Sequence, residues 1–122
     1  EEYELIKSHP VHGKRILEPI SFLRHLVPCV YHHHEAWDGS GYPSGLEGEA
    51  IPMESRILAV ADAYDAMTTD RPYRKALPHI VAMGELERFA GKQFDTRVVK
   101  VFREVIEEHR RERINLGLPV PL

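Results

Sequence analysis

Three consecutive histidines stand at positions 32–34, followed by Glu35 and Asp38 and by a Gly-Ser-Gly turn at 39–41. Each imidazole has two ring nitrogens that need partners, so adjacent histidines are costly inside a protein core. Neutral imidazole is also the commonest metal ligand in proteins. Because neighbouring side chains on a helix diverge by roughly 100°, two such histidines suit two adjacent metal ions better than one. A solvated polar patch at a helix end is the alternative explanation.

Two aspartates interrupt an otherwise apolar stretch further along the chain. Asp62 and Asp65 are three positions apart, so they share one face of a helix. An unpaired carboxylate among Ala, Val and Tyr side chains is expensive to bury. The pair therefore requires a metal ion, an arginine or a capping role, with a simple pair of ion-paired carboxylates as the alternative.

A basic segment follows at residues 71–75, where three cations and a tyrosine surround one proline. Arginine binds phosphate through two parallel hydrogen bonds, and an aromatic ring can stack on a base. A solvated basic loop would have the same composition. The segment alone therefore leaves phosphate binding and solvation open.

Four residues are candidate metal ligands because they offer imidazole or carboxylate groups at two helix ends and one helix face: His9, His33, His34 and Asp62. Such ligands suit iron, manganese, zinc or nickel. Arg71 and Arg74 could hold a phosphate beside them. Metal ions next to a phosphate site indicate hydrolysis of a phosphoester, in which the metal activates water and stabilises the developing charge.

The composition is that of one ordinary globular domain. The 122 residues are 43% hydrophobic and 29% charged, with a net charge of −3. This acidic balance argues against a surface that wraps a nucleic-acid polymer. Cys29 is the only cysteine, which excludes an internal disulfide and fits a reducing compartment. No apolar run reaches 18 residues, so we expect no membrane insertion.

Apolar periodicity predicts an all-α chain with about five helices and no strand. We expect a helical turn over 2–8 and helices over 10–18, 21–34, 52–68, 78–90 and 96–113, with a kink at Pro28. Gly91 is expected to end the helix over 78–90, and Asp95 is expected to cap the helix over 96–113. Ile80 and Val105 are expected to pack inward. The glycine-rich residues 35–50 form a long loop, and loops of that length are usually functional or disordered.

Three motifs in this sequence resemble the HD-GYP domain. They are His9-Pro10-x-x-Gly13-x-x-Ile16-Leu17, His33-His34-Glu35-x-x-Asp38-Gly39-Ser40-Gly41-Tyr42-Pro43 and Asp62-x-x-Asp65-Ala66-x-x-x-x-Arg71-Pro72-Tyr73-Arg74. The resemblance runs from Glu1 to about His109, and its Gly-Tyr-Pro segment is highly specific. It implies a cytoplasmic helical bundle of the HD superfamily that cleaves cyclic di-GMP to linear pGpG or to GMP.

The resemblance also implies a cofactor and partners. Complete domains of this type carry two or three divalent transition metal ions, often iron or manganese, and by match the ligands are His9, His33, His34 and Asp62. Four further residues become the substrate-binding set: Gly41, Tyr42, Arg71 and Arg74. The family usually forms the output half of two-component or sensor proteins, and its Gly-Tyr-Pro loop is implicated in contacts with diguanylate cyclase (GGDEF) domains.

Members of the family carry a His-Asp doublet upstream of the matched motifs, and its aspartate bridges the metal ions. The sequence departs from the family here, because its 122 residues contain no His-Asp dipeptide. We therefore expect residues 1–114 to be the C-terminal portion of an HD-GYP domain, followed by a tail over 115–122. We expect this polypeptide alone to be inactive without the bridging aspartate. The alternative is a non-catalytic signalling module that binds a partner through the Gly-Tyr-Pro loop. Helices that lack packing partners would expose apolar surface, so we also expect a homodimer.

Overall fold

The computed structural model describes Pro10, Lys14 and residues 26–120. This part of the chain forms α3 (Val27–His32), the short 3₁₀ helix η2 (Gly48–Ala50), α4 (Met53–Thr68), α5 (His79–Arg88) and α6 (Thr96–Asn115). The all-α expectation is confirmed, and within the described residues only two isolated β-bridges accompany the helices. The turn predicted over 2–8, the helix predicted over 10–18 apart from Pro10 and Lys14, the first part (21–25) of the helix predicted over 21–34, and the candidate ligand His9 lie outside the described residues.

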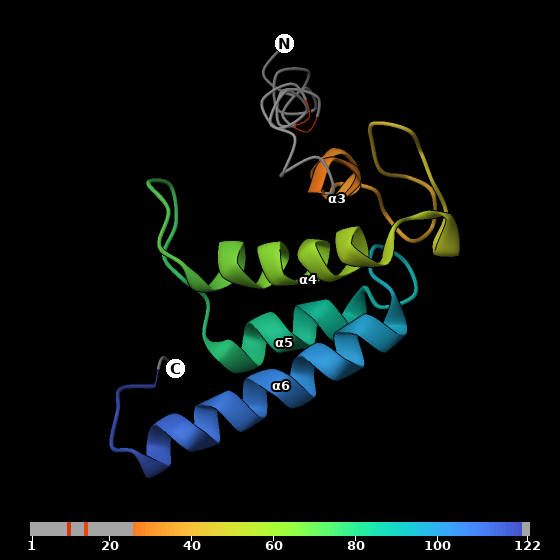
Figure 1. Cartoon of the computed structure of the whole chain (residues 1–122). Helices are drawn as coiled ribbons and strands as arrows, with labels where there is room; N and C mark the ends of the chain where they lie inside the picture. The colour runs from red at the N-terminus through yellow and green to blue at the C-terminus, as the bar shows by residue number, and fades with distance from the viewer. Residues whose placement is uncertain (1–9, 11–13, 15–25, 121–122) are drawn as a thin grey trace.

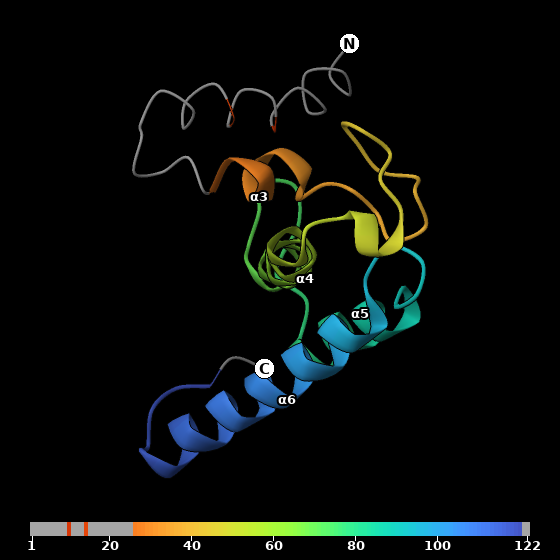
Figure 2. The same ribbon diagram turned by 45° about the vertical axis from the view of Figure 1, so that its right-hand side comes forward.

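Helix α4 is the centre of the arrangement. It lies between α3 on one side and α5 and α6 on the other (Figure 1), and it contacts all three. Turned so that α4 is seen nearly end-on, the chain shows α3 and the loop after it on one side of α4 and the α5–α6 pair on the other (Figure 2). A side chain on α4 can therefore face either the loop that follows α3 or the α5–α6 pair.

Except around Pro28, the predicted helix ends agree with the structure to within two residues, although α5 ends at Arg88 with Phe89, not Gly91, as its C-cap. Pro28 lies in the first turn of α3 and does not kink a longer described helix; in the first turn, its missing N–H costs nothing. The Asp95 side chain caps α6 by accepting hydrogen bonds from the backbone N–H groups of Arg97 and Val98, and Gly91 turns the chain with a φ of 83°.

The core lies where α4, α5 and α6 meet. Its buried members come from all three helices and from the turn between the last two: Val60, Met83, Leu86, Phe94 and Val99. The inward placement of Ile80 and Val105 was wrong, because these side chains are 77% and 57% exposed. Both lie at the edge of the 3.6-residue period, where sequence alone does not determine which neighbour covers a face.

Two polar contacts tie the helices together across this core. Arg56 on α4 donates to the buried Asp95 carboxylate at 2.9 Å. Burial alone would raise the pKa of Asp95, but the hydrogen bonds from Arg56, Arg97 and Val98 outweigh it and lower that pKa. His79 accepts from the Tyr64 hydroxyl at 2.8 Å and donates to Glu107 at 2.7 Å, which joins α4, α5 and α6 and lowers the Glu107 pKa.

The loop after α3 is organised by the buried carboxylate of Glu35, whose residue is only 4% exposed. One oxygen accepts hydrogen bonds from His32 Nδ1 at 2.9 Å and from the Ser44 N–H at 3.0 Å. The other accepts from the Leu46 N–H at 3.1 Å. Because buried carboxylates need such donors, the far side of the loop is held against the end of α3.

Gly41 allows this loop to close. Its backbone lies against the backbone of residues 34–36, where an added Cβ would overlap His34, Glu35 and Ala36. The Tyr42 N–H then bonds to the His34 carbonyl at 3.3 Å. Only glycine, which has no Cβ, allows two backbone segments to approach this closely.

We predict that Gly41→Ala destabilises the protein and that the helical Gly84→Ala does not. Gly84 has open space around the added methyl, so alanine at that position should stabilise α5 by up to about 1 kcal/mol. Gly41→Ala must instead displace the loop backbone, at a cost of roughly 1–3 kcal/mol. Urea denaturation followed by circular dichroism measures both. A Gly41→Ala variant as stable as the parent protein would contradict the packing described.

Candidate metal centre

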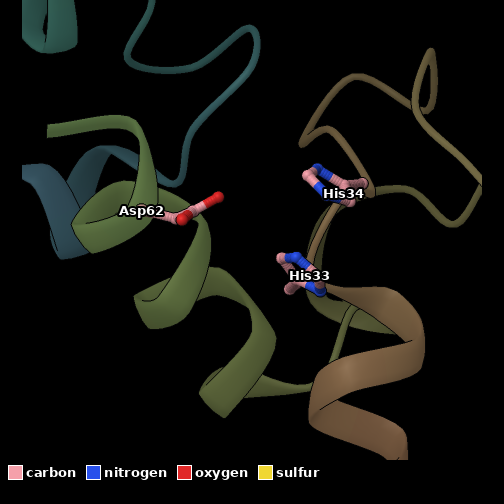
Figure 3. A group of neighbouring side chains, drawn as sticks. All are labelled: His33, His34 and Asp62. Carbon is pink, nitrogen blue, oxygen red and sulfur yellow. The ribbon is translucent and has the colours of Figure 1, made fainter. Parts of the chain in front are cut away.

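His33, His34 and Asp62 converge from two elements on one point. His33 and His34 follow the last turn of α3, and Asp62 lies in the middle of α4 with its carboxylate directed toward the two rings (Figure 3). One ligand atom from each residue lies within 4.8 Å of the other two. Two imidazoles and one carboxylate form a donor set suited to a divalent transition metal. The two adjacent histidines therefore face a common position, although neighbouring side chains on a regular helix would diverge.

The orientation of the His33 ring is fixed by its backbone. His33 Nδ1 lies 2.7 Å from the Val30 carbonyl oxygen. A carbonyl only accepts, so Nδ1 carries the hydrogen, and Nε2 is the nitrogen with the lone pair in the neutral ring. A metal-ligating histidine is typically held in this way by a carbonyl or carboxylate on its other nitrogen.

Aromatic contacts extend from the histidines into the loop. The His33 and His34 ring centroids are 4.0 Å apart, and His34 stacks on Tyr42 with centroids 5.2 Å apart and an interplanar angle of 23°. The Tyr42–Pro43 peptide bond is cis. The tyrosine of the Gly-Tyr-Pro segment is thus half-buried against a candidate ligand.

A cavity of about 560 Å³ opens in front of the three candidate ligands. Its size lies within the range of small-molecule sites. Of the predicted substrate-binding residues, Gly41 and Tyr42 line this cavity. Lys92 and Gln93, from the turn between α5 and α6, also line it. Sequence reasoning missed these two residues because only tertiary folding brings that turn beside the loop.

The other two predicted substrate contacts occupy a different place. In the described structure, the cavity lining includes neither Arg71 nor Arg74. Arg74 donates to the carbonyl oxygens of Ala66, Met67 and Lys75, so it completes the C-terminal end of α4. Arg71 forms a two-way backbone pair with Arg74, and its residue is exposed.

The second aspartate of the α4 pair is not part of the cluster. Asp65 accepts a hydrogen bond from the Thr69 hydroxyl at 3.3 Å, one turn further along the chain. Residues three apart on a helix share a face only approximately, and the roughly 60° between them is enough to separate the two carboxylates. Asp62 therefore faces the histidines, and Asp65 interacts within its own helix.

Comparisons with known proteins show the family of this chain. Residues 1–98 match the family model described as an HD domain. A cyclic di-GMP phosphodiesterase of Thermotoga maritima is 41% identical over 121 residues, which is 93% of this chain and 32% of that protein. One of Vibrio cholerae is 40% identical over 115 residues, which is 88% of this chain and 23% of that protein.

A solved structure shares the fold. The crystal structure of a cyclic GMP-AMP specific phosphodiesterase of Vibrio cholerae aligns with a TM-score of 0.74 at 26% identity, over 90% of this chain and 25% of that one. This chain spans about a third or less of the length of the curated relatives it matches. No helix in the described part of the chain has both the length and the apolar character needed to cross a membrane. The family expected from the motifs is therefore confirmed: the chain belongs to the HD domain family.

Proposed function

We propose that this chain is part of a metal-dependent phosphodiesterase that hydrolyses cyclic di-GMP to linear pGpG or GMP. The observation that carries the proposal is the convergence of His33, His34 and Asp62 at the mouth of a cavity large enough for a ligand. The names of the relatives support the choice of substrate, since each of the two cited above is called a cyclic di-GMP phosphodiesterase.

The donor set fits iron or manganese, since two neutral imidazoles and a carboxylate are ligands that these ions accept. A divalent ion, when bound, would supply Lewis-acid activation of the phosphodiester and of water. We propose His9 as a further ligand. The remaining ligands for two or three ions would come from the upstream segment that carries the His-Asp doublet in this family. On this proposal, residues 1–114 are the C-terminal portion of the HD-GYP domain, 115–122 are its tail, and the portion alone is inactive.

The chain's own residues would position the substrate in four ways. His33 is pre-oriented by its bond to the Val30 carbonyl. The half-buried Tyr42 ring forms part of the cavity wall, and Gly41 lets the loop approach closely enough to complete that wall. We propose phosphate contacts for Arg71 and Arg74. The Arg74 guanidinium would then bind both the phosphate and the carbonyl groups at the end of α4.

We predict that His33→Ala, His34→Ala and Asp62→Ala each weaken binding of Mn²⁺ by on the order of tenfold or more. His109→Ala is the matched control, because His109 lies exposed on α6, outside the cavity that the ligands face. Isothermal titration calorimetry and elemental analysis of the purified proteins measure the effect. Equal Mn²⁺ affinity in the parent and all three variants would contradict a metal centre at these residues.

A second candidate function is a signalling module that binds a diguanylate cyclase (GGDEF) domain through the outer edge of the same loop. The observation in its favour is that Ser44, Gly45 and Glu47 are exposed next to the well-held Glu35. This function requires no metal.

A pull-down of a purified GGDEF domain should then be lost with Tyr42→Ala and kept with His34→Ala. Equal retention of the GGDEF domain by both variants would argue against this second function.

We also propose a homodimer through an apolar groove between α4 and α6. Met53, Ile57, Val101 and Val105 are each 43–57% exposed there. An antiparallel pairing of two α6 helices about Val101 would place Val98 near the second copy's Val105. The same register brings Arg97 near the second copy's Glu104, which adds charge complementarity.

The dimer is tested by Val101→Glu, which places a charge at the centre of this pairing. Because Val101 is 56% exposed, the substitution should leave the fold intact and convert the protein to a monomer. Ile114→Glu is the control, since Ile114 is 64% exposed on the same helix but lies beyond the overlapping segment. Light scattering at micromolar concentration distinguishes the two; a monomeric parent protein would refute the dimer.

A further inference from the structure

The turn between α5 and α6 is bonded directly to the loop that carries the candidate metal ligands. The Trp37 N–H donates to the Gln93 carbonyl at 3.0 Å, and the Asp38 N–H donates to the Lys92 carbonyl at 2.8 Å. Residues more than 50 positions apart in the sequence therefore form one continuous wall. The side chains of Lys92 and Gln93 line the cavity that His33, His34 and Asp62 face.

The backbone of this turn is held on its other side as well. The Gly91 N–H donates to the Phe94 carbonyl at 2.7 Å, and Phe94 itself is 5% exposed in the core. The next residue, Asp95, is fixed by Arg56. Lys92 thus combines a fixed main chain with an exposed side chain at the edge of the cavity, so its ammonium group can reach a ligand at little cost in backbone ordering.

Lys92 differs in charge from the rest of the cavity wall. Among the described lining residues, it is the single lysine or arginine, whereas Glu35, Asp38 and Asp62 contribute carboxylates. A cyclic dinucleotide carries two phosphodiester groups, each with one negative charge. The candidate metal centre, together with the phosphate contacts proposed above for Arg71 and Arg74, accounts for one phosphate. The second phosphate needs a cation on the cavity wall itself, where neither arginine lies. A lysine ammonium is a compact charge that suits a phosphate.

We propose that Lys92 binds the second, non-scissile phosphate of a cyclic dinucleotide whose first phosphate lies at the His33–His34–Asp62 centre. The proposal rests on the proposed phosphodiesterase function and adds a substrate-binding residue that the sequence motifs do not include. It makes the turn between α5 and α6 part of the substrate site.

The test compares two substrates in the metal-loaded full-length protein, in which the upstream segment with the family's His-Asp doublet supplies the remaining metal ligands. Lys92→Gln should raise KM for cyclic di-GMP about tenfold, the loss expected for one charge-assisted hydrogen bond, and should leave kcat within about twofold. The same variant should leave KM unchanged for bis(p-nitrophenyl) phosphate, which has a single phosphodiester and no second phosphate. Lys92→Arg should restore most of the affinity for cyclic di-GMP. Lys100→Gln, an exposed charge change on α6, is the control.

The outcomes separate this inference from the function on which it rests. Unchanged KM for cyclic di-GMP in Lys92→Gln overturns the role of Lys92 while leaving the phosphodiesterase function intact. An equal rise in KM for both substrates also overturns it, because Lys92 would then act on the first phosphate or on the fold. A metal-loaded parent protein that neither binds nor cleaves cyclic di-GMP overturns both proposals. Equal metal content in all variants excludes an indirect effect through the ligands.

Discussion

Burial of the Glu35 carboxylate determines the course of the backbone that carries both candidate histidine ligands. Its three hydrogen-bond donors come from His32, just before those ligands, and from Ser44 and Leu46, beyond the Gly-Tyr-Pro segment. A buried carboxylate that loses its donors is strongly unfavourable. These hydrogen bonds therefore require the loop to fold back on the end of α3. The backbone contact at Gly41 and the His34–Tyr42 stack follow from that path.

The position of the third candidate ligand depends on how α3 and α4 pack. Ser55 on α4 is fully buried, and its hydroxyl lies 3.2 and 3.1 Å from the carbonyl oxygens of Pro28 and Cys29 on α3. Two turns further along α4, Asp62 reaches the level of the histidines. On the other side of α4, the Arg56–Asp95 ion pair holds the start of α6. The geometry of the site is thus a consequence of helix packing on both sides of α4.

Much of this was accessible from the sequence because it depends on local rules. The bounds of α4 and α6, the Asp95 cap and the turn at Gly91 follow from periodicity and capping residues. The choice of His33, His34 and Asp62 as candidate ligands followed from their chemistry and from a family motif, and the structure brings the three together. Lys92 and Gln93 were not predictable, since they reach the cavity through two long-range backbone hydrogen bonds. Nor was the exposure of Ile80 and Val105, which depends on what else covers each helix.

The engagement of Arg74 with the end of α4 affects how this protein can be dissected. The guanidinium satisfies carbonyl groups that the helix leaves without intrahelical partners, so removing it would loosen α4 only about one turn from Asp62. Loss of activity on truncating Arg74 would not distinguish a vanished phosphate contact from a shifted carboxylate. Arg71 is exposed in the same turn. A substitution of Arg71 can therefore remove a phosphate contact without loosening the end of α4.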